Sequence, residues 1–209
     1  MTETDVNLSI VLVGDASVGK TSLITRFVDD KFEEGSSKPT VGIDYLRKMV
    51  ELEGIKVLVR FWDTAGTEKY GAVSDTAIKM AAGAVLVYDV TKRGSFDQLR
   101  FWMMKLHEKS RPNLKIILIG NKKDLELDRV VSTAEGEKFA KENGMFFMEC
   151  SAKEEAGNVF NAFNTLVEET FSVQREVHTV RMSVVKPKLA ARILTPSSLQ
   201  TEQKKGCCG

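Results

Sequence analysis

The fold is decided by the stretch Gly14-Asp15-Ala16-Ser17-Val18-Gly19-Lys20-Thr21, which matches the phosphate-binding pattern Gly-x4-Gly-Lys-Ser/Thr. It follows the apolar run Ile10-Val11-Leu12-Val13 and precedes Ser22-Leu23-Ile24-Thr25-Arg26-Phe27, which has a helical pattern. A strand, a glycine-rich loop and a helix in this order are the context that the pattern requires. Glycines let backbone N–H groups turn inward around phosphate oxygens, and the helix N-terminus adds the positive end of its dipole. The alternative is a glycine turn with a chance lysine, which this context disfavours.

Two side chains of this stretch carry specific chemistry. Lys20 is expected to reach the β- and γ-phosphates of a nucleotide, and the Thr21 hydroxyl is expected to ligate Mg²⁺. A second strand ends in Phe61-Trp62-Asp63-Thr64-Ala65-Gly66. Asp63 suits a magnesium ion held through its water shell, and the Gly66 N–H is placed to contact the γ-phosphate.

The tetrapeptide Asn121-Lys122-Lys123-Asp124 identifies the base. It follows the apolar run Ile116-Ile117-Leu118-Ile119, at the end of a buried strand, where open α/β sheets bind their ligands. The Asp124 carboxylate can accept hydrogen bonds from the N1–H and the exocyclic amine of guanine, whereas adenine would present an acceptor. Such pairing rejects the wrong base by roughly 10⁴-fold or more. An ordinary turn also accommodates these four residues, and the phosphate loop upstream favours the guanine site.

A fourth segment, Cys150-Ser151-Ala152-Lys153, follows the strand Met145-Phe146-Phe147-Met148 and can close over the base. Four such segments in this order resemble the Ras superfamily of small GTPases, over about residues 8 to 174. The resemblance implies an α/β fold of the P-loop NTPase type, with three α/β/α layers and a mostly parallel six-stranded sheet, the G domain. It also implies GTP or GDP with Mg²⁺ as ligands. The residues expected to bind the nucleotide are Gly14, Asp15, Ala16, Ser17, Val18, Gly19, Lys20, Thr21, Ser22, Phe32, Thr40, Gly66, Asn121, Lys122, Asp124, Ser151, Ala152 and Lys153; the metal residues are Thr21, Thr40 and Asp63.

Apolar runs and helical spacing predict the elements of this domain. Strands are expected at residues 8–13, 47–52, 56–62, 83–89, 115–120 and 145–149. Helices are expected around residues 22–27, 96–106, 134–139 and 159–170, and Ser132 or Thr133 is expected to cap the third of these. We divide the chain into a short N-terminal tail at 1–7, a GTP-binding domain at 8–174 and a flexible basic tail at 175–209.

Composition limits the other classes of protein. Apolar residues make up 43% of the 209, enough for one large core, and no stretch approaches the roughly 18 apolar residues of a membrane span. The start, Met1-Thr2-Glu3-Thr4-Asp5, is acidic and polar, so a secretory signal is not expected. Residue 2 is Thr rather than Gly, so N-myristoylation is not expected either. The three cysteines do not make a disulfide framework, and the protein is expected to stay in the reducing cytosol. Cys150 is interpreted as a small buried hydrophobe, His107 and His178 as solvated, and nucleic acid is not an expected partner.

The tail carries seven Lys and Arg residues against two Glu, and we expect Pro187 and Pro196 to interrupt any helix there. It ends in Gly206-Cys207-Cys208-Gly209. Two lipid chains anchor a protein stably where one does not, and neighbouring Lys or Arg adds roughly 1 kcal/mol each near anionic lipid. The ending resembles the double-cysteine endings of the Rab branch, which implies geranylgeranylation of Cys207 and Cys208 and attachment to the cytoplasmic face of an intracellular membrane. A merely solvated tail, redox-labile thiols and zinc ligands are the alternatives.

Other residues also resemble the Rab branch. Val41-Gly42-Ile43-Asp44-Tyr45 is similar to the stretch after the switch I threonine, here Thr40, which completes the magnesium site only in the GTP state. The resemblance implies that the protein regulates vesicle traffic and that effectors bind it through Thr40–Tyr45, Trp62 and the segment 66–80. It also implies the partners of such a switch: an exchange factor, a GTPase-activating protein, a GDP-dissociation inhibitor and a geranylgeranyl transferase. Phe32 matches the aromatic that packs edge-on against guanine, with a simple core phenylalanine as the alternative.

Three departures from the Rab pattern affect function. Thr67 stands where the family has a glutamine that orients the attacking water, so slow intrinsic hydrolysis is expected, with Lys20, Thr40, Gly66 and Thr67 as the catalytic set. Ala16 and Ser17 thicken the phosphate loop. Rab proteins offer effectors a set of three aromatics, of which Tyr45 matches the first and Trp62 the central member, whereas Ala77 replaces the third. The alternative function is a GTP-holding module that binds effectors without hydrolysis of its own. A P-loop ATPase or nucleotide kinase is disfavoured by Asp124 and by Ser151-Ala152-Lys153.

Overall fold

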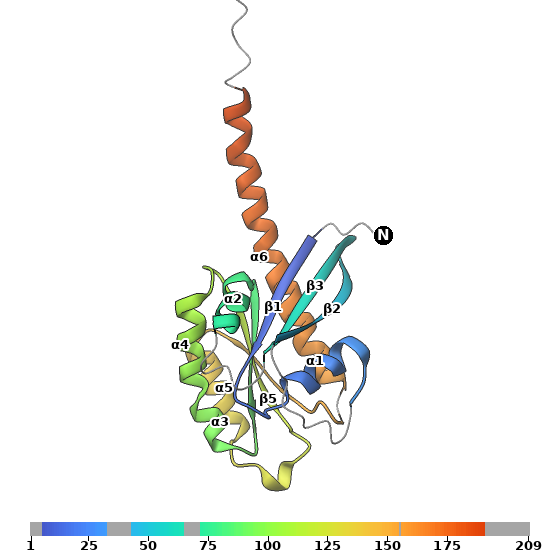
Figure 1. The fold of residues 1–209 in the computed structure, drawn as a ribbon, viewed down its shortest axis with the longest axis vertical. Coiled ribbons are helices and arrows are strands. Elements are labelled where there is room, and N and C mark those ends of the chain that lie inside the picture. The colour runs from blue at the N-terminus through green and yellow to red at the C-terminus, as the bar shows by residue number, and fades with distance from the viewer. Residues whose placement is uncertain (1–5, 33–42, 65–71, 155, 191–209) are drawn as a thin grey trace, which may run out of the picture. The chain divides into compact units, whose positions relative to one another are not determined.

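A computed structural model describes residues 6–32, 43–64, 72–154 and 156–190. Six strands form one sheet in the order β2-β3-β1-β4-β5-β6 (Figure 1). Only β2 and β3 pair antiparallel, and the other neighbours are parallel. The mostly parallel six-stranded sheet is therefore confirmed. The strands are β1 Val6–Val13, β2 Ile43–Leu52, β3 Ile55–Thr64, β4 Gly83–Asp89, β5 Lys115–Asn121 and β6 Phe146–Cys150.

Helices cover both faces of this sheet, which confirms the three-layer α/β/α arrangement. On one face, α1 and α6 pack with the strands in one hydrophobic cluster. On the other, α2, α4 and α5 pack in a second cluster. The helices are α1 Lys20–Asp29, α2 Ala72–Met80, α3 Arg93–Asp97, α4 Leu99–Lys109, α5 Thr133–Glu142 and α6 Ala156–Ala190, with a 3₁₀ turn, η2, at Glu126–Asp128.

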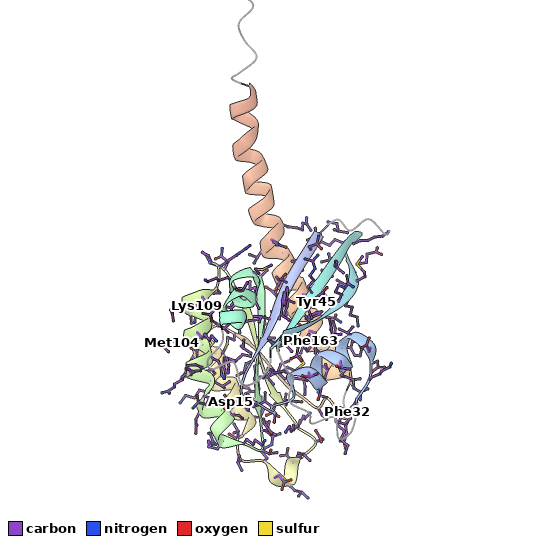
Figure 2. The ribbon with its side chains drawn as sticks, in the orientation of Figure 1. Asp15, Phe32, Tyr45, Met104, Lys109 and Phe163 are labelled. Carbon is purple, nitrogen blue, oxygen red and sulfur yellow. The ribbon has the colours of Figure 1, made fainter. Side chains whose placement is uncertain are left out.

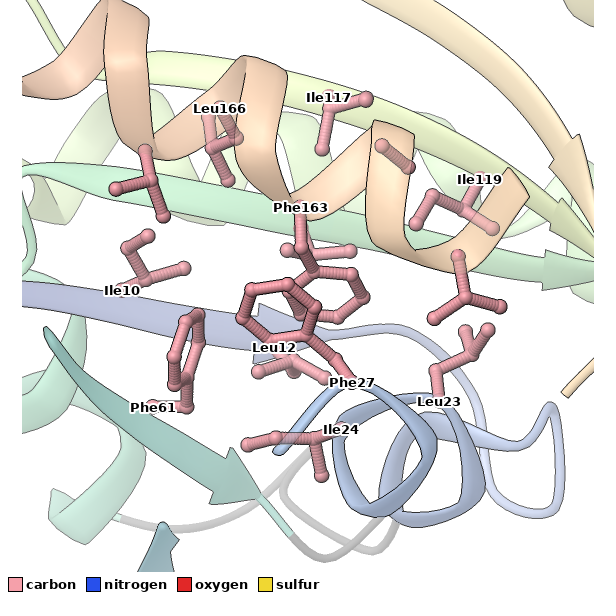
Figure 3. Close-up of a cluster of buried hydrophobic side chains, with 14 of the residues drawn as sticks. Ile10, Leu12, Leu23, Ile24, Phe27, Phe61, Ile117, Ile119, Phe163 and Leu166 are labelled. Atoms are coloured by element: carbon pink, nitrogen blue, oxygen red, sulfur yellow. The ribbon is translucent and has the colours of Figure 1, made fainter. Parts of the chain in front are cut away.

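Three aromatic rings fix α1 and α6 against the sheet (Figure 3). Phe27 of α1 stacks on Phe163 of α6 with ring centroids 4.8 Å apart and planes 15° apart. Phe61 of β3 meets both rings edge-on, at 5.4 and 5.6 Å. Each such pair contributes about 0.5–1.5 kcal/mol beyond the apolar area that it buries. Helix α1, which follows the phosphate loop, is thereby held by β3 and by α6.

The second cluster surrounds two large side chains that are fully buried, Tyr88 of β4 and Trp102 of α4. Tyr88 occupies space left open by Gly120 and Gly136, where a Cβ atom would lie 2.7 and 2.5 Å from the Tyr88 hydroxyl oxygen. Burial raises the pKa of the Tyr88 phenol well above its usual range. Tyr88 is therefore an uncharged core residue.

The elements differ from those expected in several places, and α2, Ala72–Met80, is not among the expected helices. β2 begins at Ile43 rather than residue 47, and the helix expected at residues 96–106 divides into α3 and α4 at Gln98. The chain divides into the units Met1–Gln174 and Arg175–Gly209. The prediction that Pro187 interrupts any helix was wrong, because α6 is assigned as far as Ala190. Residues 176–186 contain neither Gly nor Pro, so a helix can continue through them to the proline.

Among the described helices, none is both long enough and apolar enough to span a bilayer.

Candidate nucleotide-binding site

The loop between β1 and α1 needs both glycines of the phosphate-binding pattern, because each combines an unusual backbone conformation with a close contact. Gly14 has a φ of 144°, and a Cβ atom there would lie 2.3 Å from the carbonyl oxygen of Val87. Gly19 has a φ of 97°, and its Cβ would lie 2.2 Å from Nδ2 of Asn121. Both are conformations that L-residues rarely adopt, and both positions contact backbone or a motif side chain. The loop conformation therefore depends on glycine at each end.

Lys20 lies across this loop and is almost fully buried. Its Nζ donates hydrogen bonds to the carbonyl oxygens of Gly14 and Asp15, at 2.8 and 3.0 Å. A buried ammonium group requires partners of this kind, since an uncompensated charge is expensive in the interior. The lysine thus presents its charge at the loop whose glycines suit phosphate oxygens.

Thr21 and Asp63 bring the phosphate loop and the end of β3 together. The Thr21 Oγ1 donates to Oδ2 of Asp63 at 2.6 Å, and Asp63 is nearly buried. A hydroxyl and a carboxylate oxygen at this separation are the hard donors that Mg²⁺ prefers. No group of three or more His, Cys, Asp or Glu suited to a metal occurs in the described parts of the chain. The pair fits a magnesium ion that takes its remaining ligands from phosphate oxygens and water.

Asn121 joins three of the sequence motifs. Its Nδ2 donates to the carbonyl oxygen of Val18 at 2.8 Å, and its Oδ1 accepts from the Ala152 N–H at 3.4 Å. Asn121 is buried at the end of β5, so these bonds are shielded from water. The base motif is therefore attached to the phosphate loop on one side and to the segment 151–153 on the other.

Lys122 adopts a left-handed backbone conformation, with a φ of 67°. Its Nζ lies 2.7 Å from Oδ2 of Asp89, whose carboxylate is fully buried at the end of β4. The other oxygen of Asp89 accepts from the N–H and the hydroxyl of Thr91, at 2.9 and 2.7 Å. The Lys122 side chain is thus fixed to the end of β4, and Asp124, two residues further along the chain, is partly exposed.

The sequence that carries these motifs is similar to known proteins. A sequence model of the Ras family matches residues 9–172. Ras-related protein RABA5a of Arabidopsis thaliana is 38% identical over 209 residues, which cover 98% of this chain and 94% of that protein. Ras-related protein Rab-12 of Mus musculus is 43% identical over 166 residues, covering 79% and 68%. Ras-related protein Rab-26 of Homo sapiens is 42% identical over 165 residues, covering 79% and 64%.

The chain belongs to the Rab family of Ras-superfamily small GTPases. Ras-family GTPases bind GTP and GDP, typically with Mg²⁺, and the Thr21–Asp63 pair, the Lys20 position and the glycine loop fit these ligands. Thr40, Gly66 and Thr67 lie outside the described residues, as do Cys207 and Cys208.

Two side chains that the sequence motifs did not identify support this Rab site. Trp102 of α4 donates its Nε1–H to Oδ1 of Asp15 at 3.0 Å, which orients the carboxylate of the phosphate loop. Arg26 of α1 donates to the carbonyl oxygens of Ala152 and Lys153, at 2.8 and 3.1 Å. Neither contact has a local signal, because each joins residues far apart in the sequence.

The aromatic pair expected at the Rab effector surface is formed by neighbouring strands. Tyr45 of β2 lies opposite Trp62 of β3, with ring centroids 5.4 Å apart, and Tyr45 is 46% exposed. In Figure 2, Asp15 and Phe32 lie in the lower part of the view, and Tyr45 lies above them. Phe32 is only partly buried and packs at the border of the first core cluster. Ala77 is buried, whereas Met80 of the same helix is 45% exposed.

His107 is exposed and Cys150 is buried, as expected. The side chain of His178 lies outside the described residues.

Proposed function

We propose that the protein is a GTP/GDP switch that regulates vesicle-mediated membrane traffic, with slow intrinsic hydrolysis of GTP. The observation that supports it most is the contact of Thr21 with Asp63, because it joins the phosphate motif to the strand end that leads into residues 65–71. A group that senses the γ-phosphate belongs next to that junction. GTP then stabilises one arrangement of the flanking segments and GDP another, and effectors bind the first.

Each residue of the site has a separate task in this proposal. Lys20 stabilises negative charge on the β- and γ-phosphates, and the loop N–H groups of residues 14–19 orient them. Magnesium, when bound by Thr21 and Thr40 with Asp63 in support, neutralises phosphate charge. The Gly66 N–H contacts the γ-phosphate. Guanine is selected by Asp124 and enclosed by Lys122, the segment 151–153 and Phe32.

Thr67 makes the intrinsic reaction slow. A threonine hydroxyl cannot span the distance that a glutamine amide covers, so the attacking water is not held in line with the γ-phosphate. Misplacement of a reacting group by about 1 Å lowers a rate on the order of 10²-fold. Some activating proteins of Rab GTPases supply both an arginine and a glutamine, so stimulated hydrolysis can persist. Ala16 and Ser17 narrow the space for that arginine.

Single-turnover hydrolysis of preloaded GTP tests this assignment. We expect Thr67→Gln to hydrolyse GTP at least roughly 10-fold faster than the wild type, because an amide regains the water. Thr67→Ala is the matched control and should remain as slow as the wild type. A wild type that is already as fast as Thr67→Gln would show that residue 67 does not limit the rate. A chain that hydrolyses no GTP in either form supports the alternative, an effector-binding module that only holds GTP.

The partners and the location follow from the same assignment. Exchange factors and activating proteins act on the nucleotide, and effectors bind Thr40–Tyr45, Trp62 and the segment 66–80. Geranylgeranylation of Cys207 and Cys208 attaches the switch to the cytoplasmic face of an intracellular membrane. The basic residues before the two cysteines add attraction to anionic lipid. A GDP-dissociation inhibitor would maintain a cytosolic pool.

A further inference from the structure

All three nitrogens of the Arg26 guanidinium group donate hydrogen bonds within the unit Met1–Gln174. Its Nε donates to the Ala152 carbonyl at 2.8 Å and its Nη2 to the Lys153 carbonyl at 3.1 Å. Its Nη1 donates to the backbone oxygen and to Oδ1 of Asp30, both at 3.2 Å. The Arg26 side chain is only 15% exposed, while that of Asp30 is 66% exposed. The contact with the Ala152 carbonyl is therefore the more shielded one, whereas the contacts with Lys153 and Asp30 are exposed.

The segment 151–153 is held from two sides at one residue, Ala152. The N–H of Ala152 donates to Oδ1 of Asn121, and the carbonyl of the same residue accepts from Arg26. Ala152 is buried, so without Arg26 its carbonyl would lose a charged donor at a partly buried position. Such a loss is expensive, and bonds from a charged donor are stronger than neutral ones. Two successive carbonyls match the planar fork of an arginine but not the point charge of a lysine.

Helix α1 supplies a fixed base for this contact. It begins at Lys20 in the phosphate loop, and in its last turn Phe27 packs in the aromatic cluster. Lys48 of β2 donates to the carbonyl of Phe27 and lies over the rings of Phe27 and Phe160, at 4.2 and 4.8 Å. The last turn of α1 is thus held by contacts that do not involve Arg26. Removing the guanidinium group should release the segment 151–153 without unfolding the helix.

We propose that Arg26 is a positioning residue for nucleotide retention. It ties the segment that closes over the base to the helix that begins at the phosphate loop, so the two ends of one nucleotide are gripped by a single rigid body. The inference rests on the proposed guanine site. Without Arg26 the base side opens independently of the phosphate side, and the nucleotide dissociates faster.

The test is the dissociation of a fluorescent GDP analogue from the full chain with Mg²⁺, chased by excess GDP. Arg26→Met should dissociate about 10-fold faster or more, because it loses both charged hydrogen bonds to the carbonyls. Arg26→Lys keeps the charge without the fork and should also dissociate faster, by roughly 3-fold or more. Asp30→Asn is the control: it removes only an exposed ion pair, tolerates the left-handed backbone of residue 30, and should stay within about 2-fold of the wild type.

Hydrogen exchange separates positioning from general loss of stability. In GDP-loaded Arg26→Met, the amides of residues 151–154 should exchange faster, while those of β4 should be unchanged. Equal acceleration in β4, or a wild-type rate in Arg26→Met or Arg26→Lys, overturns the proposal. A wild-type chain that retains no GDP contradicts the proposed function and this inference together, whereas normal wild-type retention with an unaltered Arg26→Met contradicts the inference alone.

Discussion

Gly136 lies inside α5, where replacing glycine by alanine ordinarily stabilises a helix by about 1 kcal/mol. Here a Cβ atom would lie 2.5 Å from the Tyr88 hydroxyl oxygen and 2.6 Å from Cζ of Phe147. Tyr88 is fully buried and wedged between β5 and α5, so it cannot move aside. Steric overlap should therefore outweigh helix propensity at this residue.

We expect Gly136→Ala to lower the free energy of unfolding by about 1–3 kcal/mol, the usual range for overpacking a core. Gly157→Ala in α6 is the matched control, because nothing lies within 4 Å of its Cβ position. That control should be neutral or slightly stabilising. Urea unfolding of both variants under saturating GDP measures the difference. A stabilised Gly136→Ala would mean that the space beside Tyr88 is larger than the distances indicate.

At the scale of single residues, the sequence predicted the contacts that follow from a local pattern. Gly14, Gly19, Lys20 and Thr21 could be assigned because the chemistry of a phosphate loop lies in consecutive residues. Arg26 and Trp102 could not be assigned, since each acts on backbone or carboxylate atoms that only the fold brings near. Their residue types also occur on ordinary amphipathic helices.

At the scale of elements, the start of α5 depends on ionised Glu135. Ser132 caps the helix in a reciprocal capping box with Glu135, and Arg93 donates to both carboxylate oxygens of Glu135, at 2.8 and 3.2 Å. The hydrogen bonds from Arg93 first, and those from Ser132 next, lower the pKa of the Glu135 carboxyl from 4.5 to about 2. The charged form is thus favoured in the folded state, and the capped helix is favoured with it.

A lowered pKa sets the pH range of this contribution. It is fully present above pH 4.5, the ordinary value, and is lost as the pH falls from 4.5 toward about 2. We expect Glu135→Gln to unfold at a lower urea concentration than the wild type at pH 7, and the gap to shrink below pH 4.5. Unfolding midpoints at pH 7, 5, 4 and 3 measure it. A gap that stays constant over this range would show that the charge of Glu135 does not stabilise α5.

Element boundaries were predictable where a terminus carries its own signal. The expected cap of α5 is confirmed at Ser132. The break between α3 and α4 at Gln98 has no such signal in the sequence. Backbone hydrogen bonds continue across it, because the Trp102 N–H donates to the Gln98 carbonyl and the Gln98 N–H donates to the Gly94 carbonyl. β2 begins earlier than expected because Ile43–Tyr45 pair with Asp63 and other residues of β3, a long-range contact.

At the scale of the whole molecule, the unit Met1–Gln174 contains both core clusters and every described site residue. We therefore expect a chain truncated after Gln174 to bind GDP with the affinity and unfolding midpoint of the full chain. The same truncation removes Cys207 and Cys208 and should abolish retention on membranes in cells that prenylate proteins. Calorimetric titration and cell fractionation measure the two effects. Reduced GDP affinity in the truncated chain would assign residues 175–209 a part in the fold, and continued membrane retention would exclude the lipid anchor.

The fold class followed from the sequence because strand ends and motifs alternate in one order. The extent of α6 did not follow, since Pro187 and the basic composition predict an interrupted tail, whereas the helix continues to Ala190. Residues 8–174 as a domain and 175–209 as a tail remain predictions that the truncation tests.

The contact of Phe27 with Phe163 also sets an order on the ribosome. Phe27 is synthesised early, but its stacking partner, the Phe163 ring, leaves the tunnel only on the order of 10 s later, at the rates of translation. Ser151, Ala152 and Lys153, which we propose close over the base, emerge within that same interval, long after the phosphate loop. We therefore expect a nascent chain to retain a nucleotide firmly only once its translation has reached α6.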